Sequence, residues 1–515
     1  MANLESIAIK GLKSIADSGV VNLKPINILV GNNSSGKSSF LRAFPLIRQS
    51  VEQRTRGPIL WNGIYTDFES FDNSIHDSPS TFASENKKYI EFEFEFDWEN
   101  PSKFYDKSKF KCRASIKIAA GKSKFTSYTS IYTLEIDNHE ITLQFDESGR
   151  LLDISSPEVS WDLSKIDFKY QQSETDSLLP FLSAGLGKIL LQNNSKELTH
   201  RLFGQIKSIL RELSGRRSDA RLTDLAYKII SLRGSIDERV IKFLNLHVTE
   251  KWKRLEADNS DLIFIAALSD LLFLIENSEL INRGLSKIFK GVRYIAPLRT
   301  STERYYRFQD LSIEEIDHQG ENLAMFLTAV PRRWREKLDE WTSENFSFLI
   351  SEKYEGSNIS IEISYENTSQ SDNITDMGFG FSQLLPIIVN LWSVSSGYEN
   401  SRKRKVEQSD SVLFAIEQPE LHLHPKMQSK MALIFSKAIT LALENNIKLI
   451  LIIETHSEAL ISKFGDMICL RQEVAENVSV RLFEQDRLTR NTSIREAFFN
   501  EKGVLNNWPT DFFAY

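Results

Sequence analysis

The chain has 515 residues, of which 41% are hydrophobic and 26% are charged, and its formal net charge is −7. This composition is ordinary for a soluble globular protein of two or three domains, and the negative charge restricts any nucleic-acid contact to a local basic patch. The two cysteines, Cys112 and Cys469, are too few for a disulfide framework or a metal cluster.

The hydropathy pattern of the sequence predicts no membrane segment. Residues 1–5 contain no basic segment followed by an apolar run, so we expect no secretory signal. The longest apolar stretches, such as residues 262–268, are too short to cross a bilayer. We therefore expect a cytoplasmic protein without membrane contact.

The first predicted elements are two strands, over residues 4–9 and 20–30, joined by a turn around residues 11–14. The second strand leads into residues 31–38, which read Gly-Asn-Asn-Ser-Ser-Gly-Lys-Ser and match the pattern G-x-x-x-x-G-K-[ST] in full. A helix is predicted directly afterwards, over about residues 37–54. A chance Gly-Ser loop is the alternative, but it explains neither the strand before the loop nor the helix after it.

This loop has the residue types that hold phosphate groups. Its glycines let the backbone curl so that N–H groups point at phosphate oxygens, and the helix start adds unpaired N–H groups and partial positive charge. We expect Lys37 to reach the β- and γ-phosphates and the Ser38 hydroxyl to bind Mg²⁺. The sequence thus predicts a nucleoside triphosphate site. The residues expected to contact the nucleotide here are Asn32, Asn33, Ser34, Ser35, Gly36, Lys37, Ser38 and Ser39.

Strands are predicted for the next part of the chain. Residues 61–71 lack a helical period and are expected to form a loop over the nucleotide. From about residue 89 to residue 155 the apolar pattern has period two, which favours an antiparallel meander. Residues 91–96 alternate strictly between Glu and Phe. The three glutamates resemble an acidic catalytic cluster, but the alternation favours a solvated sheet face.

A helical period replaces the period of two over about residues 175–290. Sustained heptads are missing, which argues against a long coiled-coil rod and favours a compact helical insertion. Four arginines lie in or near one of its turns: Arg211, Arg216, Arg217 and Arg221. They form either a solvated helix end or a contact to the backbone of nucleic acid.

The C-terminal part supplies acidic groups that suit a nucleotide site. Residues 412–416 form an apolar strand that ends in Glu417, the form of a Walker B element, and hard carboxylate oxygen suits Mg²⁺. A second strand over residues 448–453 is followed by a segment that contains His456. A histidine at this position is either structural or able to sense the γ-phosphate or orient the attacking water.

A second glycine-rich segment, residues 376–383, reads Asp-Met-Gly-Phe-Gly-Phe-Ser-Gln and stands before a helix predicted from Leu384. It is either a plain loop-to-helix junction or a second anion site at a helix N-terminus. In the second case, the turn of one subunit closes on the γ-phosphate held by another subunit. The residues expected to do so are Gly378, Gly380, Ser382 and Gln383.

These motifs, in this order, resemble the ABC-class ATPases of the OLD, RecF and SMC-related group. Within that group the chain is similar to bacterial AAA ATPases of antiphage-defence operons, including the retron and Septu types. The resemblance covers residues 1–75 and about 291–513, with support from residues 61–71, 294–299 and 503–513.

The resemblance implies an α/β fold: an ABC-type P-loop ATPase head with an antiparallel β-meander and a helical insertion. It predicts three segments, an N-terminal part of the head (1–160), the insertion (161–290) and a C-terminal part of the head (291–515). It implies ATP and Mg²⁺ as cofactors and a homodimer or higher oligomer.

For individual residues, the resemblance implies that Lys37 and Ser38 bind phosphate and Mg²⁺, that Glu417 stands at the Walker B aspartate, and that His456 is the switch histidine. Residues 378–383 match the signature motif, although the sequence is not Leu-Ser-Gly-Gly-Gln. The usual catalytic glutamate is replaced by Gln418, whose carboxamide cannot take a proton from water. The base must then lie elsewhere, with Glu420 as a candidate, or hydrolysis is slow.

No clear Q-loop glutamine is present in the sequence, and Gln49, Gln53 and the loop around Asp67 are the candidates. About sixty residues follow His456, too few for the nuclease domain that OLD-type nucleases carry at this place. The first hypothesis is therefore an ATPase that senses for, or regulates, a separately encoded effector such as a nuclease. The second is a RecF- or SMC-like ATPase acting directly on DNA, and the third is a self-contained nuclease.

Overall fold

The computed structural model describes residues 3–76, 88–100, 102–123, 125–136, 139–157, 160–162, 178–180, 192–256, 258–297, 299, 303–309, 313–365, 370–402, 411–486 and 488–509. The chain divides into two compact units, one made of Met1–Asn22 and Leu46–Lys290, the other of Leu23–Pro45 and Gly291–Tyr515. The P-loop strand thus joins the C-terminal part of the chain. Parts of the motifs considered above lie outside the described residues: Leu298 and residues 510–513.

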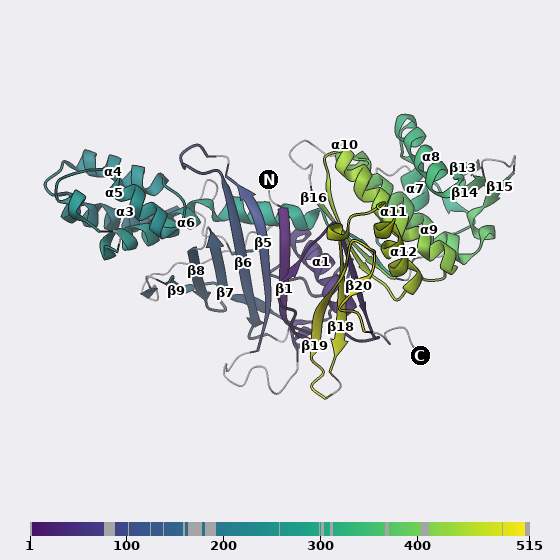
Figure 1. Cartoon of the computed structure of the whole chain (residues 1–515), viewed down its shortest axis with the longest axis horizontal. Coiled ribbons are helices and arrows are strands. Elements are labelled where there is room, and N and C mark those ends of the chain that lie inside the picture. Colours follow the sequence, from purple (N-terminus) through teal and green to yellow (C-terminus); the bar gives the residue numbers. More distant parts are fainter. Residues whose placement is uncertain are drawn as a thin grey trace. The chain divides into compact units, whose positions relative to one another are not determined.

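The first unit contains a nine-stranded antiparallel sheet in the order β10-β9-β8-β7-β6-β5-β1-β2, with β3 paired to β1 (Figure 1). Its strands are β1 (Asn3–Leu12), β2 (Ile15–Asp17), β3 (Val21–Asn22), β5 (Tyr89–Glu99), β6 (Lys109–Ala120), β7 (Ser127–Ile136), β8 (His139–Phe145), β9 (Leu151–Ser155) and β10 (Ser160–Asp162). Each strand from β5 to β10 pairs with the next along the chain, as in the predicted meander. A short helix, α2 (Phe71–Ser74), precedes β5.

The alternation in β5 separates its two faces. Phe92, Phe94 and Phe96 are fully buried, and each contributes about 1.5–3 kcal/mol by leaving water. The glutamates lie on the other face and form ion pairs with basic side chains of β1 and β6, including Glu95 with Lys111 at 2.7 Å. This face is less solvated than we expected, because Glu91 is only 7% exposed beneath its neighbours.

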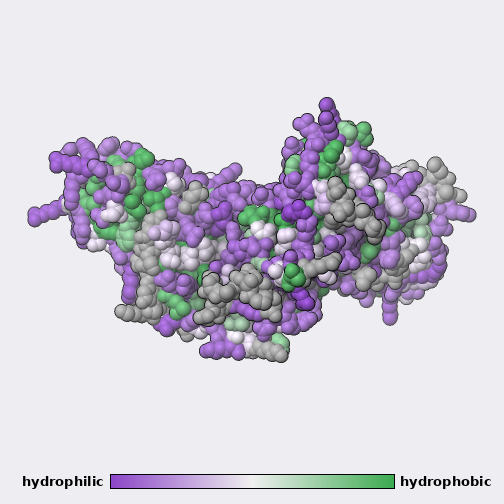
Figure 2. All heavy atoms as spheres, turned by 60° about the horizontal axis from the view of Figure 1, so that its bottom comes forward, coloured by the Kyte–Doolittle hydropathy of each residue, from purple (hydrophilic) through white to green (hydrophobic). Residues whose placement is uncertain are grey.

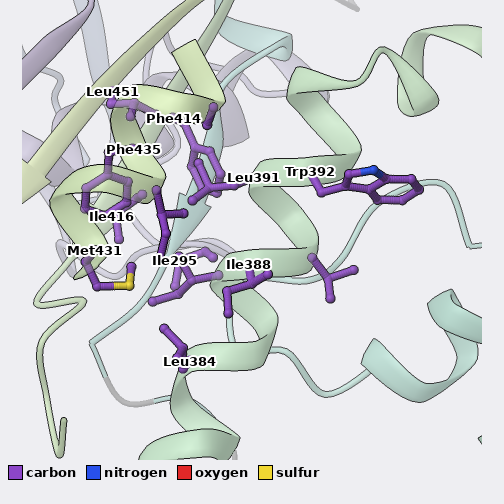
Figure 3. Close-up of a cluster of buried hydrophobic side chains, with 14 of the residues drawn as sticks. Ile295, Leu384, Ile388, Leu391, Trp392, Phe414, Ile416, Met431, Phe435 and Leu451 are labelled. Atoms are coloured by element: carbon purple, nitrogen blue, oxygen red, sulfur yellow. The ribbon is translucent and has the colours of Figure 1, made fainter. Parts of the chain in front are cut away.

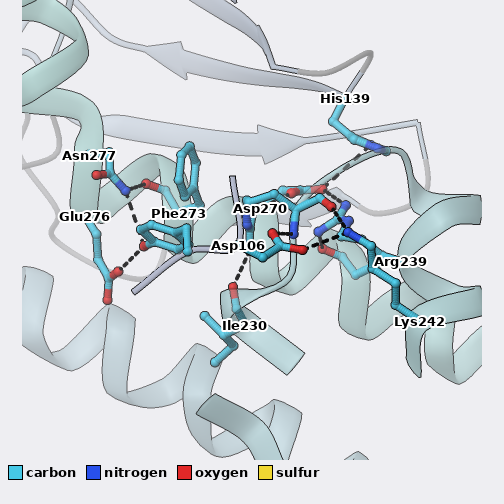
Figure 4. Close-up of polar contacts among 12 residues, drawn as sticks. Asp106, His139, Ile230, Arg239, Lys242, Asp270, Phe273, Glu276 and Asn277 are labelled. Carbon is cyan, nitrogen blue, oxygen red and sulfur yellow. Dashed lines mark hydrogen bonds and ion pairs between the residues drawn. The ribbon is translucent and has the colours of Figure 1, made fainter. Parts of the chain in front are cut away.

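Within its described residues, the predicted insertion contains four α-helices and one short 3-10 helix: α3 (Gln192–Ser214), α4 (Asp219–Ser231), α5 (Ile236–Leu244), η1 (Trp252–Arg254) and α6 (Ser260–Lys290). The long helix α6 crosses the phenylalanine face of the sheet, where the rings of Phe94 and Phe289 lie 5.2 Å apart (Figure 1). Polar contacts also tie the insertion to the sheet (Figure 4). Asp270 of α6 accepts hydrogen bonds from Arg233 and Arg239 and lies 3.6 Å from His139 of β8.

The second unit is built on a seven-stranded sheet in the order β11-β16-β17-β4-β18-β19-β20, in which the first five strands are parallel. The strands are β11 (Arg293–Ile295), β16 (Ser411–Glu417), β17 (Lys448–Glu454), β4 (Ile26–Gly31), β18 (Val478–Gln485), β19 (Thr492–Phe499) and β20 (Leu505–Asn506). The strand predicted over residues 20–30 is two strands, β3 and β4. Between them, Pro25 has no N–H to donate, and the Asn27 side chain bonds both backbone groups of Lys24.

Helices cover this parallel sheet, and a small sheet adjoins them. The helices are α1 (Lys37–Glu52), α7 (Leu323–Thr328), α8 (Arg332–Phe346), η2 (Ile374–Met377), α9 (Phe379–Ser395), α10 (Tyr398–Arg402), α11 (Pro425–Glu444), α12 (Glu458–Cys469) and η3 (Ala475–Asn477). The small sheet contains β12 (Tyr306–Arg307), β13 (Phe348–Glu355), β14 (Asn358–Tyr365) and β15 (Ser371–Asn373).

The core of this unit lies between the parallel strands and the helices α9 and α11 (Figure 3). The buried side chains that meet there include Ile295, Leu384, Ile388, Leu391, Trp392, Phe414, Ile416, Met431, Phe435 and Leu451. The packing of both helices fixes the strand ends that carry the acidic residues of the site. The structure thus confirms the predicted mixed α/β fold.

The surface agrees with the composition. The face of the molecule drawn in Figure 2 is largely hydrophilic, and hydrophobic residues reach it in separate small patches. In the described part of the chain, no helix is both long and apolar enough to cross a membrane.

Candidate nucleotide site

The loop over residues 31–38 joins β4 to α1 and has the curled backbone that its glycines predict. Gly31 and Gly36 have φ angles of +153° and +95°, and Ser34 has a φ of +64°. A Cβ at Gly31 would stand 2.3 Å from the carbonyl oxygen of Phe483, so no other residue fits there. Asn32, Asn33 and Ser34 are exposed at the outer side of the loop.

The two motif side chains of this loop are engaged by protein groups. The Lys37 ammonium donates to the carbonyl oxygens of Gly31 at 2.9 Å and Asn32 at 2.8 Å. Burial lowers the pKa of Lys37, although Glu454 and Glu420 oppose the shift. The Ser38 hydroxyl donates to Oε1 of Glu454 at 2.9 Å. Lys37 thus bonds the loop to itself, and Ser38 bonds it to the end of β17.

The remaining predicted contacts on this loop differ in exposure. Ser35 is 1% exposed, and its hydroxyl has no hydrogen-bond partner. Its carbonyl accepts a bond from the Thr492 hydroxyl at 2.9 Å, which fixes the loop from the side of β19. Gly36 is buried, and Ser39 is half-buried in the first turn of α1.

Two carboxylates end neighbouring parallel strands next to this loop. Glu417 of β16 and Glu454 of β17 are register partners, and Glu454 is also paired with Leu29 of β4. Burial raises the pKa of Glu454 to about 7, and the charge of Glu417 adds to this shift. The sequence analysis assigned no role to Glu454. The available signal was its position, because it ends a buried strand in the way that Glu417 does.

Glu417 is held by two groups that the sequence analysis also missed. Arg42 of α1 donates from Nε to Oε1 at 2.7 Å and from its terminal nitrogen to Oε2 at 2.8 Å. The Tyr294 hydroxyl donates to Oε1 at 2.8 Å. The hydrogen bonds with Glu417 raise the pKa of Arg42, and burial raises the pKa of Tyr294. In this conformation both oxygens of the Glu417 carboxylate accept hydrogen bonds from protein groups.

Gln418 follows in a strained backbone conformation, with φ of +43°. Its N–H donates to the carbonyl of Glu454 at 2.8 Å, so the turn after β16 is fastened to the end of β17. Its side chain is half-buried. A left-handed conformation costs a residue with a Cβ about 1–2 kcal/mol, so the surrounding structure must enforce the turn.

Glu420 and His456, far apart in sequence, are brought together. Oε1 of Glu420 accepts the backbone N–H of His456 at 2.6 Å, and its Oε2 is buried. Burial raises the pKa of Glu420. The His456 side chain is exposed, and partial burial, together with the charge of Lys37, lowers its pKa.

Arg299 lies beneath the same turn. Its guanidinium donates to the carbonyl oxygens of Glu417 at 3.0 Å and Gln418 at 3.4 Å, and its Nε and other terminal nitrogen have no partner among the described residues. Burial lowers the pKa of Arg299 to about 10. Buried donors without partners mark a place where a further acceptor would be stabilised.

The signature-like segment differs from the prediction in one respect. The helix α9 begins at Phe379 rather than at Leu384, so residues 379–383 are already helical. Gly378 is exposed with φ of +91° and caps the helix, whereas Ser382 and Gln383 are buried. The Gln383 amide donates to the Arg299 carbonyl at 3.1 Å and accepts the Arg299 N–H at 3.3 Å. Gln383 therefore positions Arg299 within its own chain.

Gln49, a candidate Q-loop residue, is 1% exposed in the first unit. Its amide donates to the carbonyls of Leu60 and Thr66, and its oxygen accepts the N–H groups of Tyr65 and Thr66. All four bonding positions of the amide are used within this loop. Gln53 and Asp67 are exposed.

The residues present fit a nucleotide with Mg²⁺. The described residues contain no group of three or more His, Cys, Asp or Glu that would bind a metal by itself. Mg²⁺ in such sites relies on one or two protein oxygens together with phosphate oxygens. Ser38 and the unpartnered Oε2 of Glu454 are suitable oxygens, and Glu417 becomes one if Arg42 releases it. The metal would neutralise phosphate charge.

Comparison with known proteins identifies the family. Searching curated proteins gives no match. Among solved structures, the chain is similar to the Smc head domain with an extended coiled coil bound to the C-terminal domain of ScpA from Pyrococcus furiosus, with 12% identity, coverage of 96% of both chains and a TM-score of 0.34. The SMC head domain from Thermotoga maritima has 8% identity, coverage of 96% of this chain and 98% of that chain, and a TM-score of 0.34.

A family model described as an AAA ATPase domain matches residues 3–461. The match spans the P-loop, the Walker B strand and the segment around His456, whose side chains or backbone groups meet in the second unit. It therefore includes the loop, both strand-end carboxylates and His456, whereas Phe483 and Thr492, which contact the loop, lie beyond it. The chain belongs to the AAA ATPase domain family.

Proposed function

We propose that this protein is an ABC-type ATPase that binds ATP, hydrolyses it slowly, dimerises on ATP and regulates a separately encoded effector, such as a nuclease, in antiphage defence. One observation carries the ATP-switch part of the proposal. Lys37, Ser38 and Glu417 are each bonded to protein groups. ATP and Mg²⁺ must replace these partners. Nucleotide binding therefore changes contacts at the ends of β4, β16 and β17 and in α1.

Slow hydrolysis is supported by Gln418. A carboxamide has no basic oxygen at neutral pH and cannot accept the proton of the attacking water. Glu420, two residues after Gln418, is the candidate base, but one of its oxygens is bonded to the backbone of His456. An enzyme that holds ATP longer than it hydrolyses it acts as a switch rather than a motor.

Dimerisation on ATP is supported by the N-terminus of α9. Gly378 is exposed, Gly380 is half-buried, and a helix start with accessible N–H groups favours an anion. A second subunit that offers its γ-phosphate would supply that anion. The effector and the defence role rest on the resemblance of the motifs to defence ATPases.

The test of nucleotide binding compares the wild-type protein with Lys37→Ala, using titration with a fluorescent ATP analogue in the presence of Mg²⁺. Lys502→Ala, at an exposed position of the same unit, is the matched control. We expect weaker binding and no hydrolysis in Lys37→Ala alone. Equal affinity in wild type and Lys37→Ala would refute the assignment of the site.

The test of the defence role uses the genes beside this one. We expect an HNH nuclease or a reverse transcriptase among them, and we expect phage plating to fall only when this protein and that partner are expressed together. Lys37→Ala should restore plating. Protection by this protein alone would contradict the proposal of a separate effector.

A second function, direct action on DNA as in RecF- or SMC-like ATPases, is favoured by one observation. A cavity of about 520 Å³ at the turn between α3 and α4 is lined by Arg211, Gly215, Arg216 and Arg217. Arg211 is paired with Asp219 and Arg217 with the carbonyl of Val248, whereas Arg216 is exposed. Steeply salt-dependent DNA binding that Arg216→Glu weakens would support this function, and an unchanged band shift would count against it.

A further inference from the structure

A second cavity is lined by described residues that all belong to the first unit. It has a volume of about 560 Å³ and is lined by the segment that follows α1, by the loop around Trp61 and by the turn between β6 and β7. This volume is within the range of about 300–1,000 Å³ that is usual for small-molecule sites.

The cavity walls are held together by direct contacts. The Trp61 indole N–H donates to the Ser127 hydroxyl at 3.1 Å, and both residues are buried. A Cβ at Gly57 would stand 2.5 Å from the Ser127 carbonyl oxygen, so the two backbones touch there. The Thr55 hydroxyl donates to the Gly57 carbonyl at 2.6 Å. The site is therefore formed before any ligand enters.

Two arginines at this cavity have no acidic partner. Arg54 and Arg56 are exposed, and neither forms an ion pair or a hydrogen bond with another described residue. Two carboxylates line the same cavity, but both bond elsewhere: Glu69 accepts from the Asn73 amide, and Glu147 accepts from the Lys122 backbone. Two guanidinium groups at one opening are suited to a phosphate, which they bind through paired N–H groups.

Aromatic rings stand beside these arginines. Phe125 is 74% exposed on the turn between β6 and β7, and Tyr128 is half-buried at the start of β7. An exposed phenylalanine at a cavity mouth is costly in water and gains energy when a flat ring stacks on it. Asn62 is exposed at the same cavity, and its amide oxygen offers an acceptor for a hydroxyl or amino group of a ligand.

We propose that this cavity binds a phosphorylated nucleotide unit, either free or at the end of a nucleic-acid strand. Arg54 and Arg56 contact the phosphate, and Phe125 and Tyr128 stack on the base. None of the lining residues belongs to the P-loop, whose Lys37 needs a β- and γ-phosphate. Through this cavity the protein binds a second ligand in addition to ATP.

The experiment measures binding to the full-length protein by two probes: AMP by calorimetry, and a ten-nucleotide oligothymidylate with a 5′-phosphate by fluorescence anisotropy. The variants are the double substitution Arg54→Ala with Arg56→Ala, and Phe125→Ala. The control is the double substitution Arg332→Ala with Arg333→Ala, two exposed arginines of α8. Thermal melting checks that each variant is folded.

We expect at least one probe to bind, with affinity about tenfold lower in each cavity variant and unchanged in the control and in Lys37→Ala. Binding of AMP identifies a free nucleotide as the ligand. Binding of the oligonucleotide that is lost without its 5′-phosphate identifies a strand end. Absence of binding by both probes, or equal binding in wild type and both cavity variants, would overturn the proposal. Loss of binding in Lys37→Ala would place the probe in the ATP site and overturn it as well.

Discussion

Arg42 and Glu417, which are 375 residues apart, form a two-pronged ion pair with distances of 2.7 Å and 2.8 Å. The Glu417 side chain is 2% exposed, whereas that of Arg42 is 39% exposed. The arginine therefore neutralises a carboxylate that the fold has buried at a strand end. This pair links the first turns of α1 to the end of β16.

Removing the arginine should destabilise the protein. For Arg42→Ala we expect a loss of about 2 kcal/mol of unfolding free energy, because Glu417 keeps its burial and loses a charged partner. Arg42→Lys should restore only part of this loss, since an ammonium cannot form the fork. Urea unfolding measures the change, and Arg332→Ala, whose side chain is 95% exposed, is the control. Equal midpoints for Arg42→Ala and the control would contradict the prediction.

Tyr294 should act on the same carboxylate. Tyr294→Phe removes one hydrogen bond and should cost about 1 kcal/mol of unfolding free energy. Because both residues bond Oε1 of Glu417, the combined variant with Arg42→Ala should show a coupling energy of about 0.5–3 kcal/mol. A double-mutant cycle by urea unfolding provides this value. Strict additivity would mean that the two residues act independently.

Glu454 should matter for metal-dependent turnover more than for ATP binding. The hydroxyl of Ser38 lies 2.9 Å from its Oε1, and its Oε2 has no hydrogen-bond partner. In Glu454→Gln we expect about a tenfold or larger fall in Mg²⁺-dependent hydrolysis, with ATP affinity within about threefold of wild type. Phosphate release at varied Mg²⁺ concentration measures this effect. The control is Glu458→Gln, an exposed position four residues on, and the same Mg²⁺ dependence in both variants would contradict the role.

Gln418 offers a test of the missing base. Gln418→Glu should raise turnover by about tenfold or more if proton removal limits the rate. The substitution keeps the side-chain length and the same backbone strain, so the fold should be unchanged. Single-turnover hydrolysis measures the rate, and Gln472→Glu, at an exposed position of the same unit, serves as the control. An unchanged rate would mean that Glu420 or another group already accepts the proton.

Local patterns predicted the loop and the strand ends well. The glycine spacing of residues 31–38 requires positive φ angles, and Gly31 and Gly36 have them. The strand that ends in Glu417 was visible because a buried parallel strand is a continuous apolar run. Such features depend on neighbours in the chain, so the sequence alone shows them.

Contacts between distant segments could not be predicted in this way. No nearby residue indicates that Arg42 will bond Glu417 or that Gln383 will hold the backbone of Arg299. The start of α9 was misplaced because two glycines suggested a turn, yet only Gly378 has a positive φ, and packing carries Gly380 into the helix. Tertiary contacts decided these points.

The central claim is that this protein dimerises when it binds ATP. Analytical ultracentrifugation of the full chain, without nucleotide and with ATP and Mg²⁺, tests it most directly. Our account predicts a doubled mass with ATP for the wild type and for Glu454→Gln, and no change for Lys37→Ala. An unchanged mass of the wild type at saturating ATP, or a doubling in Lys37→Ala, would contradict it.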